Sequence, residues 1–198
     1  VNTFNEAFVL GADELQLGFL KELQGTKISL EKEKYDYHFS LTPPYEIISN
    51  AFLSPNELDE IRKVELALNI YYNSHAYERT IKYLFSDLKL NPFQVFLDIA
   101  NYPRFKKTLQ IDEKAKLLYY ALKEKLGEEI LYFIKQDYLM RKPIKPKIWW
   151  KNEIPRGLRQ EIYQKFIEKY PDLDLNYLYR YGHLEKYQDK YFLVTYHP

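Results

Sequence analysis

The clearest pattern of hydrophobic and polar positions runs from Ser54 to Ser74. Ser54, Pro55 and Glu57 form a typical helix start, with a capping box and a proline at the first helical position. Apolar residues then recur at spacings of three and four, which places them on one helical face: Leu58, Ile61, Val64, Leu68 and Tyr71. Three more apolar residues lie off that stripe: Leu66, Ala67 and Ile70. The pattern predicts a central helix that is packed on more than one side.

Helical patterns with short breaks between them follow along the chain. The predicted helices span 76–88, 93–102, 113–126, 128–141 and 156–170. Asp112 is the predicted cap of the helix at 113–126, and Gly127 is its predicted end. Residues 1–11 are predicted to be the end of a helix stopped by Gly11, and residues 172–181 a turn or a short helix. The short breaks favour a bundle in which neighbouring helices run antiparallel.

A few segments alternate between apolar and polar residues as strands do. Residues 15–20 fit a strand, with a helix over 13–23 as the alternative, and Gly18 weakens the helix. A short charged helix is expected over 30–37 and a short strand over 45–49. Residues 184–196 predict a terminal β-hairpin. The fold class is therefore mainly α, a helical bundle with minor β structure near the N-terminus and in the C-terminal hairpin.

Composition and charge narrow the function classes. The formal net charge of +1 favours neither nucleic acid nor an anionic membrane as a partner, and no apolar run approaches the length of a membrane span. Without cysteine the chain has no disulfide, thiolate nucleophile or cysteine-ligated metal centre, which is compatible with a cytoplasmic protein. The 20 tyrosines and 12 phenylalanines predict a core with many tyrosines at its rim.

Common catalytic patterns are missing from the sequence. None of the histidines at 38, 75, 183 and 197 stands at a metal-binding spacing, and no phosphate-binding glycine loop or Gly-x-Ser-x-Gly motif occurs. Pairs of adjacent acidic residues stand at predicted helix starts, where they suit the helix dipole better than paired acid–base chemistry. We therefore identify no catalytic residue and no metal ligand.

One stretch carries a family resemblance. Residues 16–21 (QLGFLK), followed by Leu23 and residues 25–28 (GTKI), resemble the late-barrel segment of cobalamin-binding radical S-adenosylmethionine proteins. The rest of the chain resembles the domain of unknown function that follows the barrel in one branch of that superfamily. The matching pieces are 33–35 (EKY), 43–49 (PPYEIIS), 53–54 (LS), 64–65 (VE) and 71–74 (YYNS). On this resemblance residues 1–49 are the end of the barrel with a linker, and residues 50–198 are a helical C-terminal domain.

The resemblance implies a catalytic apparatus that this chain does not carry. Family members bind an iron–sulfur cluster through three cysteines near the start of the barrel, use S-adenosylmethionine, and often bind cobalamin in a preceding domain. We therefore expect a non-catalytic C-terminal portion of a longer enzyme, inactive and cofactor-free alone. Its partners would be the barrel and cobalamin domains of the same polypeptide, where it would complete or cover the barrel and shape substrate access. Gln16, Lys21 and Thr26 would then face substrate or adenosylmethionine, whereas a salt bridge or a solvated position is the alternative role for Lys21.

A second candidate lies between the predicted helices at 128–141 and 156–170. Residues 141–151 (RKPIKPKIWWK) hold five cations, no acid and two tryptophans: Arg141, Lys142, Lys145, Lys147, Lys151, Trp149 and Trp150. Cations interleaved with aromatic rings can bind single-stranded nucleic acid by phosphate contact and stacking. A solvated loop whose tryptophans anchor it to the bundle is the alternative. The alternative function class is thus a helical module that binds protein or single-stranded nucleic acid.

Overall fold

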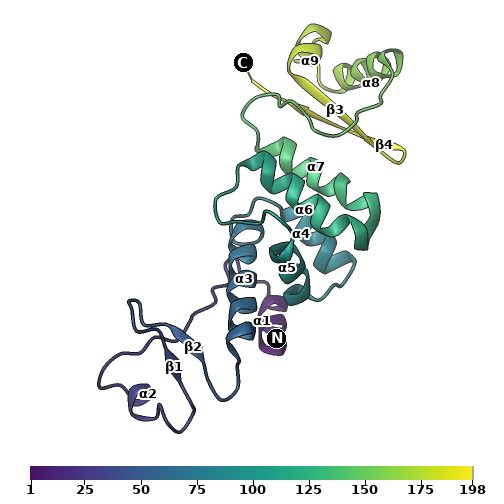
Figure 1. The fold of residues 1–198 in the computed structure, drawn as a ribbon. Helices are drawn as coiled ribbons and strands as arrows, with labels where there is room; N and C mark the ends of the chain where they lie inside the picture. Colours follow the sequence, from purple (N-terminus) through teal and green to yellow (C-terminus); the bar gives the residue numbers. More distant parts are fainter. Residues whose placement is uncertain (198) are drawn as a thin grey trace.

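The computed structural model describes residues 1–197 and places them in three parts along the chain (Figure 1). A small N-terminal lobe contains the helix α2 (Lys27–Leu30) and the strands β1 (His38–Phe39) and β2 (Ile47–Ser49). A helical bundle forms the middle, and a C-terminal unit of two helices and a hairpin follows it. The fold is mainly α with minor β structure, as the sequence predicts. None of the described helices is long and apolar enough to cross a membrane.

The bundle consists of helices whose apolar faces share one core. They are α1 (Asn2–Val9), α3 (Pro55–Tyr71), α4 (Glu78–Lys82), α5 (Pro92–Asn101), α6 (Ile111–Leu126) and α7 (Ile130–Arg141). A π-helical turn, η1 (Tyr83–Asp87), continues α4, and the 3₁₀ turn η2 (Gly127–Glu129) joins α6 to α7. Phe4 and Phe8 of α1 lie in the core, so the bundle includes a helix from before the predicted boundary at Ser49.

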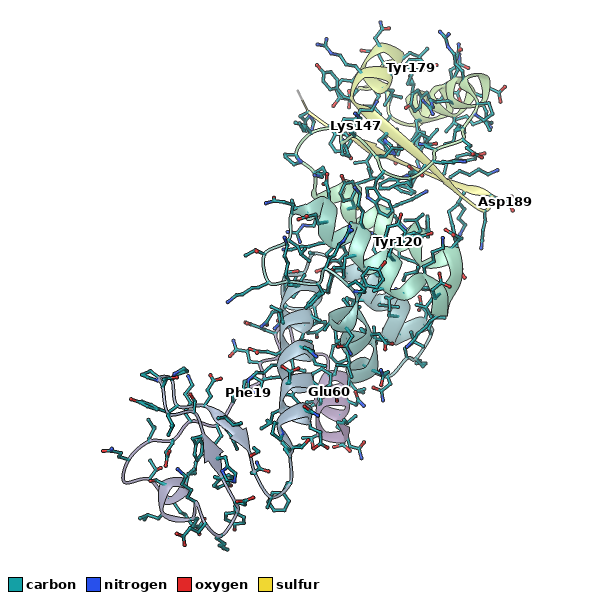
Figure 2. The ribbon with its side chains drawn as sticks, viewed as in Figure 1. Phe19, Glu60, Tyr120, Lys147, Tyr179 and Asp189 are labelled. Carbon is teal, nitrogen blue, oxygen red and sulfur yellow. The ribbon has the colours of Figure 1, made fainter. Side chains whose placement is uncertain are left out.

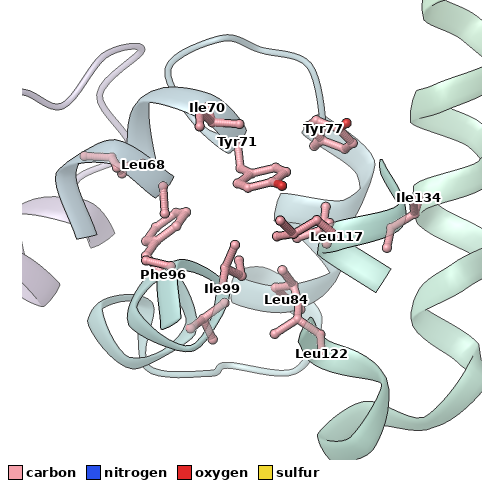
Figure 3. Close-up of a cluster of buried hydrophobic side chains, with 14 of the residues drawn as sticks. Leu68, Ile70, Tyr71, Tyr77, Leu84, Phe96, Ile99, Leu117, Leu122 and Ile134 are labelled. Carbon is pink, nitrogen blue, oxygen red and sulfur yellow. The ribbon is translucent and has the colours of Figure 1, made fainter. Parts of the chain in front are cut away.

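The central helix has the start and the packing that its sequence predicts. The Ser54 side chain accepts a hydrogen bond from the Glu57 backbone N–H, and the Glu57 carboxylate accepts one from the Ser54 backbone N–H. Leu68 and Tyr71 are fully buried beside Phe96 of α5 and Leu117 of α6 (Figure 3). The Tyr71 hydroxyl donates to the Lys114 carbonyl at 3.1 Å. Buried tyrosines thus keep a polar partner while their rings fill the core.

Buried Asp137 of α7 fixes the start of α4 from across the bundle. Its carboxylate accepts hydrogen bonds from the backbone N–H groups of Arg79 and Thr80, at 3.2 and 2.9 Å, and from the Thr80 hydroxyl at 2.7 Å. Asp137, which is 57 positions from Thr80 in sequence, therefore caps the start of α4 in place of a local side chain. Burial raises the pKa of Asp137, and the Thr80 hydrogen bonds oppose that rise.

The C-terminal unit has a small core of its own. Helices α8 (Arg156–Lys169) and α9 (Leu175–Tyr181) pack with the antiparallel hairpin of β3 (Gly182–Tyr187) and β4 (Lys190–Thr195). Ile162, Tyr163, Leu178 and Leu184 are buried between them. The predicted hairpin is confirmed, and residues 175–181 form a helix, which resolves the two possibilities left open for 172–181.

Three local predictions are wrong. Residues 15–20 form neither a strand nor a helix. The chain is extended here, and its pairing with the segment before β2 is limited to one isolated β-bridge, between Lys21 and Glu46. Helix α2 covers Lys27–Leu30, where Thr26 caps it, and residues 31–36 are turns in place of the helix expected over 30–37. The cap of α6 is Gln110, with Glu113 completing a capping box. Asp112 is already inside that helix and bonds across the bundle.

Candidate functional site

The predicted substrate-facing residues lie on one extended segment of the N-terminal lobe, which we define as residues 12–53. Gln16 is exposed, and its side-chain amide donates to Glu14 at 3.0 Å. Lys21 is exposed, and no carboxylate lies within 4 Å of its ammonium group in the part of the chain that the structure describes. The Thr26 hydroxyl donates to the Leu23 carbonyl at 2.7 Å. Thr26 therefore has a structural role as a cap, whereas Gln16 and Lys21 remain accessible.

The N-terminal lobe is held to the bundle by Arg62 of α3. The Arg62 guanidinium donates to the Ile47 carbonyl at 2.7 Å and lies over the Phe19 ring, 4.9 Å from its centroid. The lobe has a very small core, in which only Phe39 and Ile47 of the lobe and Leu58 of α3 are buried. A core of this size contributes little stability by itself.

The same lobe exposes a disproportionate amount of apolar surface. Six of the sixteen exposed large hydrophobic side chains among the described residues lie in it, although it is about a fifth of the chain: Leu23, Leu30, Leu41, Tyr45, Ile48 and Phe52. Leu41 is 96% exposed and Leu30 is 80% exposed. Apolar surface gathered on one part of a protein is typical of a region that another surface covers.

The tryptophans of the linker 141–151 pack inward. The Trp149 ring lies 5.7 Å from the Tyr119 ring and 6.2 Å from the Tyr120 ring. Trp150 meets the Tyr138 ring edge-on at 5.6 Å. Both indoles are partly buried against the bundle. Both tryptophans therefore anchor the linker to the bundle, which is the alternative to base stacking that the sequence left open.

Two of the five linker cations are also engaged within the chain. Lys142 forms an ion pair with Asp112, which holds the pKa of that carboxyl below its ordinary value. Lys145 donates to the Tyr179 carbonyl at 3.1 Å, and burial together with the Arg159 charge lowers the pKa of Lys145. Arg141, Lys147 and Lys151 are exposed. The linker therefore presents three cations without an exposed aromatic platform beside them.

A buried polar cluster, which the sequence reading missed, joins the linker to both neighbouring parts. Glu185 of β3 is 2% exposed. One of its carboxylate oxygens lies 2.7 Å from His183 Nε2 and accepts from the Trp150 indole N–H at 2.6 Å; the other accepts from the Lys135 ammonium at 3.0 Å. Asn152 donates to the Leu184 carbonyl at 2.7 Å. We name Lys135, Trp150, Asn152, His183 and Glu185 the junction cluster.

The electrostatics of the junction cluster favour an ionised Glu185. Burial raises the pKa of a carboxyl group, but the hydrogen bond with His183, the charge of Lys135 and the Trp150 indole lower it more, so the net pKa lies below the ordinary value. Every oxygen of this carboxylate has a partner. We therefore interpret the cluster as a structural connection between α7, the linker and β3, because no oxygen of the carboxylate is left free for a substrate. No local spacing could have revealed the cluster, because its members come from α7, from the linker and the residue after it, and from β3.

Comparison with known protein families gives a match over most of the chain. Residues 33–194 match the model of a family described as "Protein of unknown function (DUF4080)". The matched range contains most of the N-terminal lobe's exposed apolar residues, the bundle from α3 onward and the C-terminal unit. No curated protein and no solved structure matches the chain.

Proposed function

The chain belongs to the DUF4080 family, and from this premise we propose that it is the C-terminal portion of a cobalamin-binding radical S-adenosylmethionine enzyme. In that role the N-terminal lobe docks on the catalytic barrel, and the bundle and the C-terminal unit cover or flank its substrate opening. Support comes from the resemblance of residues 16–28 to a late-barrel segment and from the family match over the region that resembles the following domain.

The observation that carries this proposal is the exposed apolar surface of the N-terminal lobe. Leu23, Leu30, Leu41 and Phe52 are each more than 60% exposed, in a lobe that contributes only two buried residues to its core. Burying such side chains against a barrel would give each of them the roughly 1.5–3 kcal/mol that a fully buried large apolar side chain contributes. Exposed Gln16 and Lys21 lie on the same lobe, where docking would bring them to the barrel.

The residues of this chain do not fit the implied iron–sulfur cluster. The cluster needs thiolate ligands, and the sequence has no cysteine. Among residues 1–197 no group of three His, Asp or Glu side chains is arranged to hold a metal ion. We therefore assign cluster, adenosylmethionine and cobalamin chemistry to other segments of the proposed enzyme, and none of its steps to residues of this chain.

The alternative function, a nucleic-acid-binding module built on the linker 141–151, has less support. Trp149 and Trp150 have their rings against Tyr119, Tyr120 and Tyr138, so stacking on a base would require them to leave these contacts. Protein interaction through the N-terminal lobe agrees better with the distribution of apolar surface. That role differs from the barrel-docking proposal only in the identity of the partner.

Leu41→Asn distinguishes a docked lobe from a free one. In the chain 1–198, Leu41 is almost fully exposed, so the substitution should change the free energy of unfolding by no more than about 0.5 kcal/mol. In the enzyme with its barrel attached, the same substitution should cost about 2–3 kcal/mol, because a buried leucine is replaced by an unpaired amide. Urea denaturation of both proteins measures the two values.

Ile144→Asn is the matched control, since Ile144 is also exposed but lies in the linker, far along the chain from the lobe. It should cost little in both proteins. Equal costs of Leu41→Asn in the short chain and in the longer enzyme would contradict docking through this surface.

A further inference from the structure

A groove on the bundle combines aromatic rings with cations. It lies between the loop that follows α5 and the outer side of α6, with a volume of about 830 Å³. Tyr102, Arg104 and Lys106 line it from the loop, and Lys116 and Tyr120 line it from α6. Figure 2 shows Tyr120 on the bundle below the linker. The volume lies within the range of roughly 300–1,000 Å³ that small-molecule sites occupy.

The cations of this groove lack partners that neighbouring lysines have. Lys123 and Lys125 of α6 pair with Glu128 and Asp98. In contrast, no carboxylate lies within 4 Å of the charged groups of Arg104, Lys106 or Lys116 in the described part of the chain. Besides the hydrogen bond from Lys142, the charge of Lys116 lowers the pKa of Asp112, so Lys116 is partly compensated from outside the groove. The groove lining itself holds three cations and one carboxylate, which leaves an excess of positive charge there.

The groove lining also contains one carboxylate, that of Glu113, which already accepts a hydrogen bond within the chain. Glu113 completes the capping box of α6, where its carboxylate accepts a hydrogen bond from the Gln110 backbone N–H at 2.8 Å. Its charge therefore serves the helix start, and it does not pair with the groove cations. An anion entering the groove would meet three positive side chains and one engaged carboxylate.

The aromatic side of the groove offers a planar contact surface. The Tyr120 side chain is 46% exposed, and its ring is held by Tyr119 at 5.0 Å and Trp149 at 6.2 Å. Leu109 and Leu117 add apolar lining. A half-exposed ring that neighbouring rings hold in place can stack with a planar group.

The loop that carries two of the cations has an unusual backbone. Arg104 has φ +73°, in the left-handed region that residues other than glycine rarely adopt. Such conformations persist where the surrounding structure holds them, and they are frequent beside ligand sites. Here the conformation occurs at a residue that lines the groove.

We propose that this groove binds a nucleotide, with the base against Tyr120 and the phosphates between Arg104, Lys106 and Lys116. Ring and anion are both required, because the groove supplies an aromatic face and a cluster of cations side by side. The nucleotide is either free or one unit of a single strand, and both share this chemistry. The inference is independent of the barrel-docking proposal, and of the linker 141–151 it uses only Trp149, whose ring lies against Tyr120.

Calorimetric titration of the chain with four probes tests the inference. ATP should bind at least about tenfold more tightly than adenosine, which lacks the anion, and than tripolyphosphate, which lacks the ring. The affinity for ATP should fall as salt rises, because exposed charges carry the contact. A ten-nucleotide oligothymidylate identifies the source: tighter binding than ATP indicates a single strand, and weaker binding indicates a free nucleotide.

Variants at exposed positions locate the site without disturbing the core. Lys116→Ala and Tyr120→Ala should each weaken ATP binding roughly tenfold, while Tyr120→Phe keeps the ring and the affinity. Lys165→Ala and Tyr170→Ala, at exposed positions in and beside α8, should leave it unchanged. The inference is overturned if neither ATP nor the oligonucleotide binds at 1 mM, a concentration of the order of a weak site's Kd. Equal affinities for tripolyphosphate and ATP, or unchanged affinities in both alanine variants, would also overturn it.

Discussion

Glu185→Gln should lower the free energy of unfolding by about 3 kcal/mol or more, because it removes one charge from a buried ion pair and leaves the other in place. Lys135 would keep its ammonium group in a site that is only 14% exposed, facing a neutral amide. The amide would also present a donor where His183 or the Trp150 indole now meets a carboxylate oxygen. Unsatisfied or mismatched polar groups in such a site each add to the loss.

The pH dependence of stability provides a second test of the contribution of Glu185. Glu185 has a folded-state pKa below its ordinary value of 4.5, so the folded state favours the ionised form. Its contribution to stability is present above the ordinary pKa and is lost as the pH falls through the lowered folded-state pKa. The wild-type chain should therefore lose stability on acidification below about pH 4.5, and Glu185→Gln should lose less over the same interval.

Urea denaturation at pH 7 and at acidic pH measures both effects. Glu168→Gln is the matched control, because Glu168 is an exposed carboxylate of α8, and it should change the free energy of unfolding by no more than about 0.5 kcal/mol. If the two variants lose equal stability, the junction cluster does not hold the C-terminal unit to the bundle.

Phe96→Ala should cost about 3–5 kcal/mol of stability, the usual range for deleting a fully buried phenylalanine ring. Phe96 is 0% exposed and lies beside three other rings: Phe4, Phe8 and Phe85, at 6.4, 5.7 and 5.5 Å. Deleting it leaves a cavity between α1, α4–η1 and α5 that these rings can fill only in part.

This substitution also tests whether α1 belongs to the bundle, since two of the three rings come from it. Thermal or urea unfolding gives the loss, and amide exchange over residues 2–9 shows whether α1 loosens. Phe52→Ala is the control, at a phenylalanine that is 74% exposed in the N-terminal lobe. A loss below about 1 kcal/mol for Phe96→Ala would mean that α1 and α5 do not pack as described.

Local signals made most of the bundle predictable. The capping box at Ser54, the proline at position 55 and the glycine at 127 fix helix ends through their own backbone and side-chain chemistry. The hairpin at 182–195 follows from alternation over a short turn. Where a tertiary contact outweighed a local preference, the prediction failed. Asp112 has good cap chemistry, but Lys142 and Tyr138 bind its carboxylate, and Gln110 caps α6 in its place.

The candidate sites were harder to predict, because their members are distant in sequence. The composition of the linker 141–151 drew attention to Trp149 and Trp150, yet only the fold shows their rings packed on α6 and α7. The junction cluster combines residues up to 50 positions apart. In the groove between α6 and the loop after α5, the sequence shows a local run of cations at 104–107 (RFKK). The proximity of this run to Lys116 and Tyr120 depends on how the loop folds back on α6.

The most direct test of the central proposal is the reading frame upstream of Val1 in the source genome. The proposal predicts that the frame continues for a barrel's length and encodes a Cys-x3-Cys-x2-Cys motif. The longer protein should then bind an iron–sulfur cluster anaerobically and cleave S-adenosylmethionine, whereas the chain 1–198 should bind neither cluster nor cobalamin. A frame that starts near Val1 without that motif, or tight stoichiometric cobalamin binding by the chain 1–198, would contradict the assignment as a non-catalytic C-terminal portion.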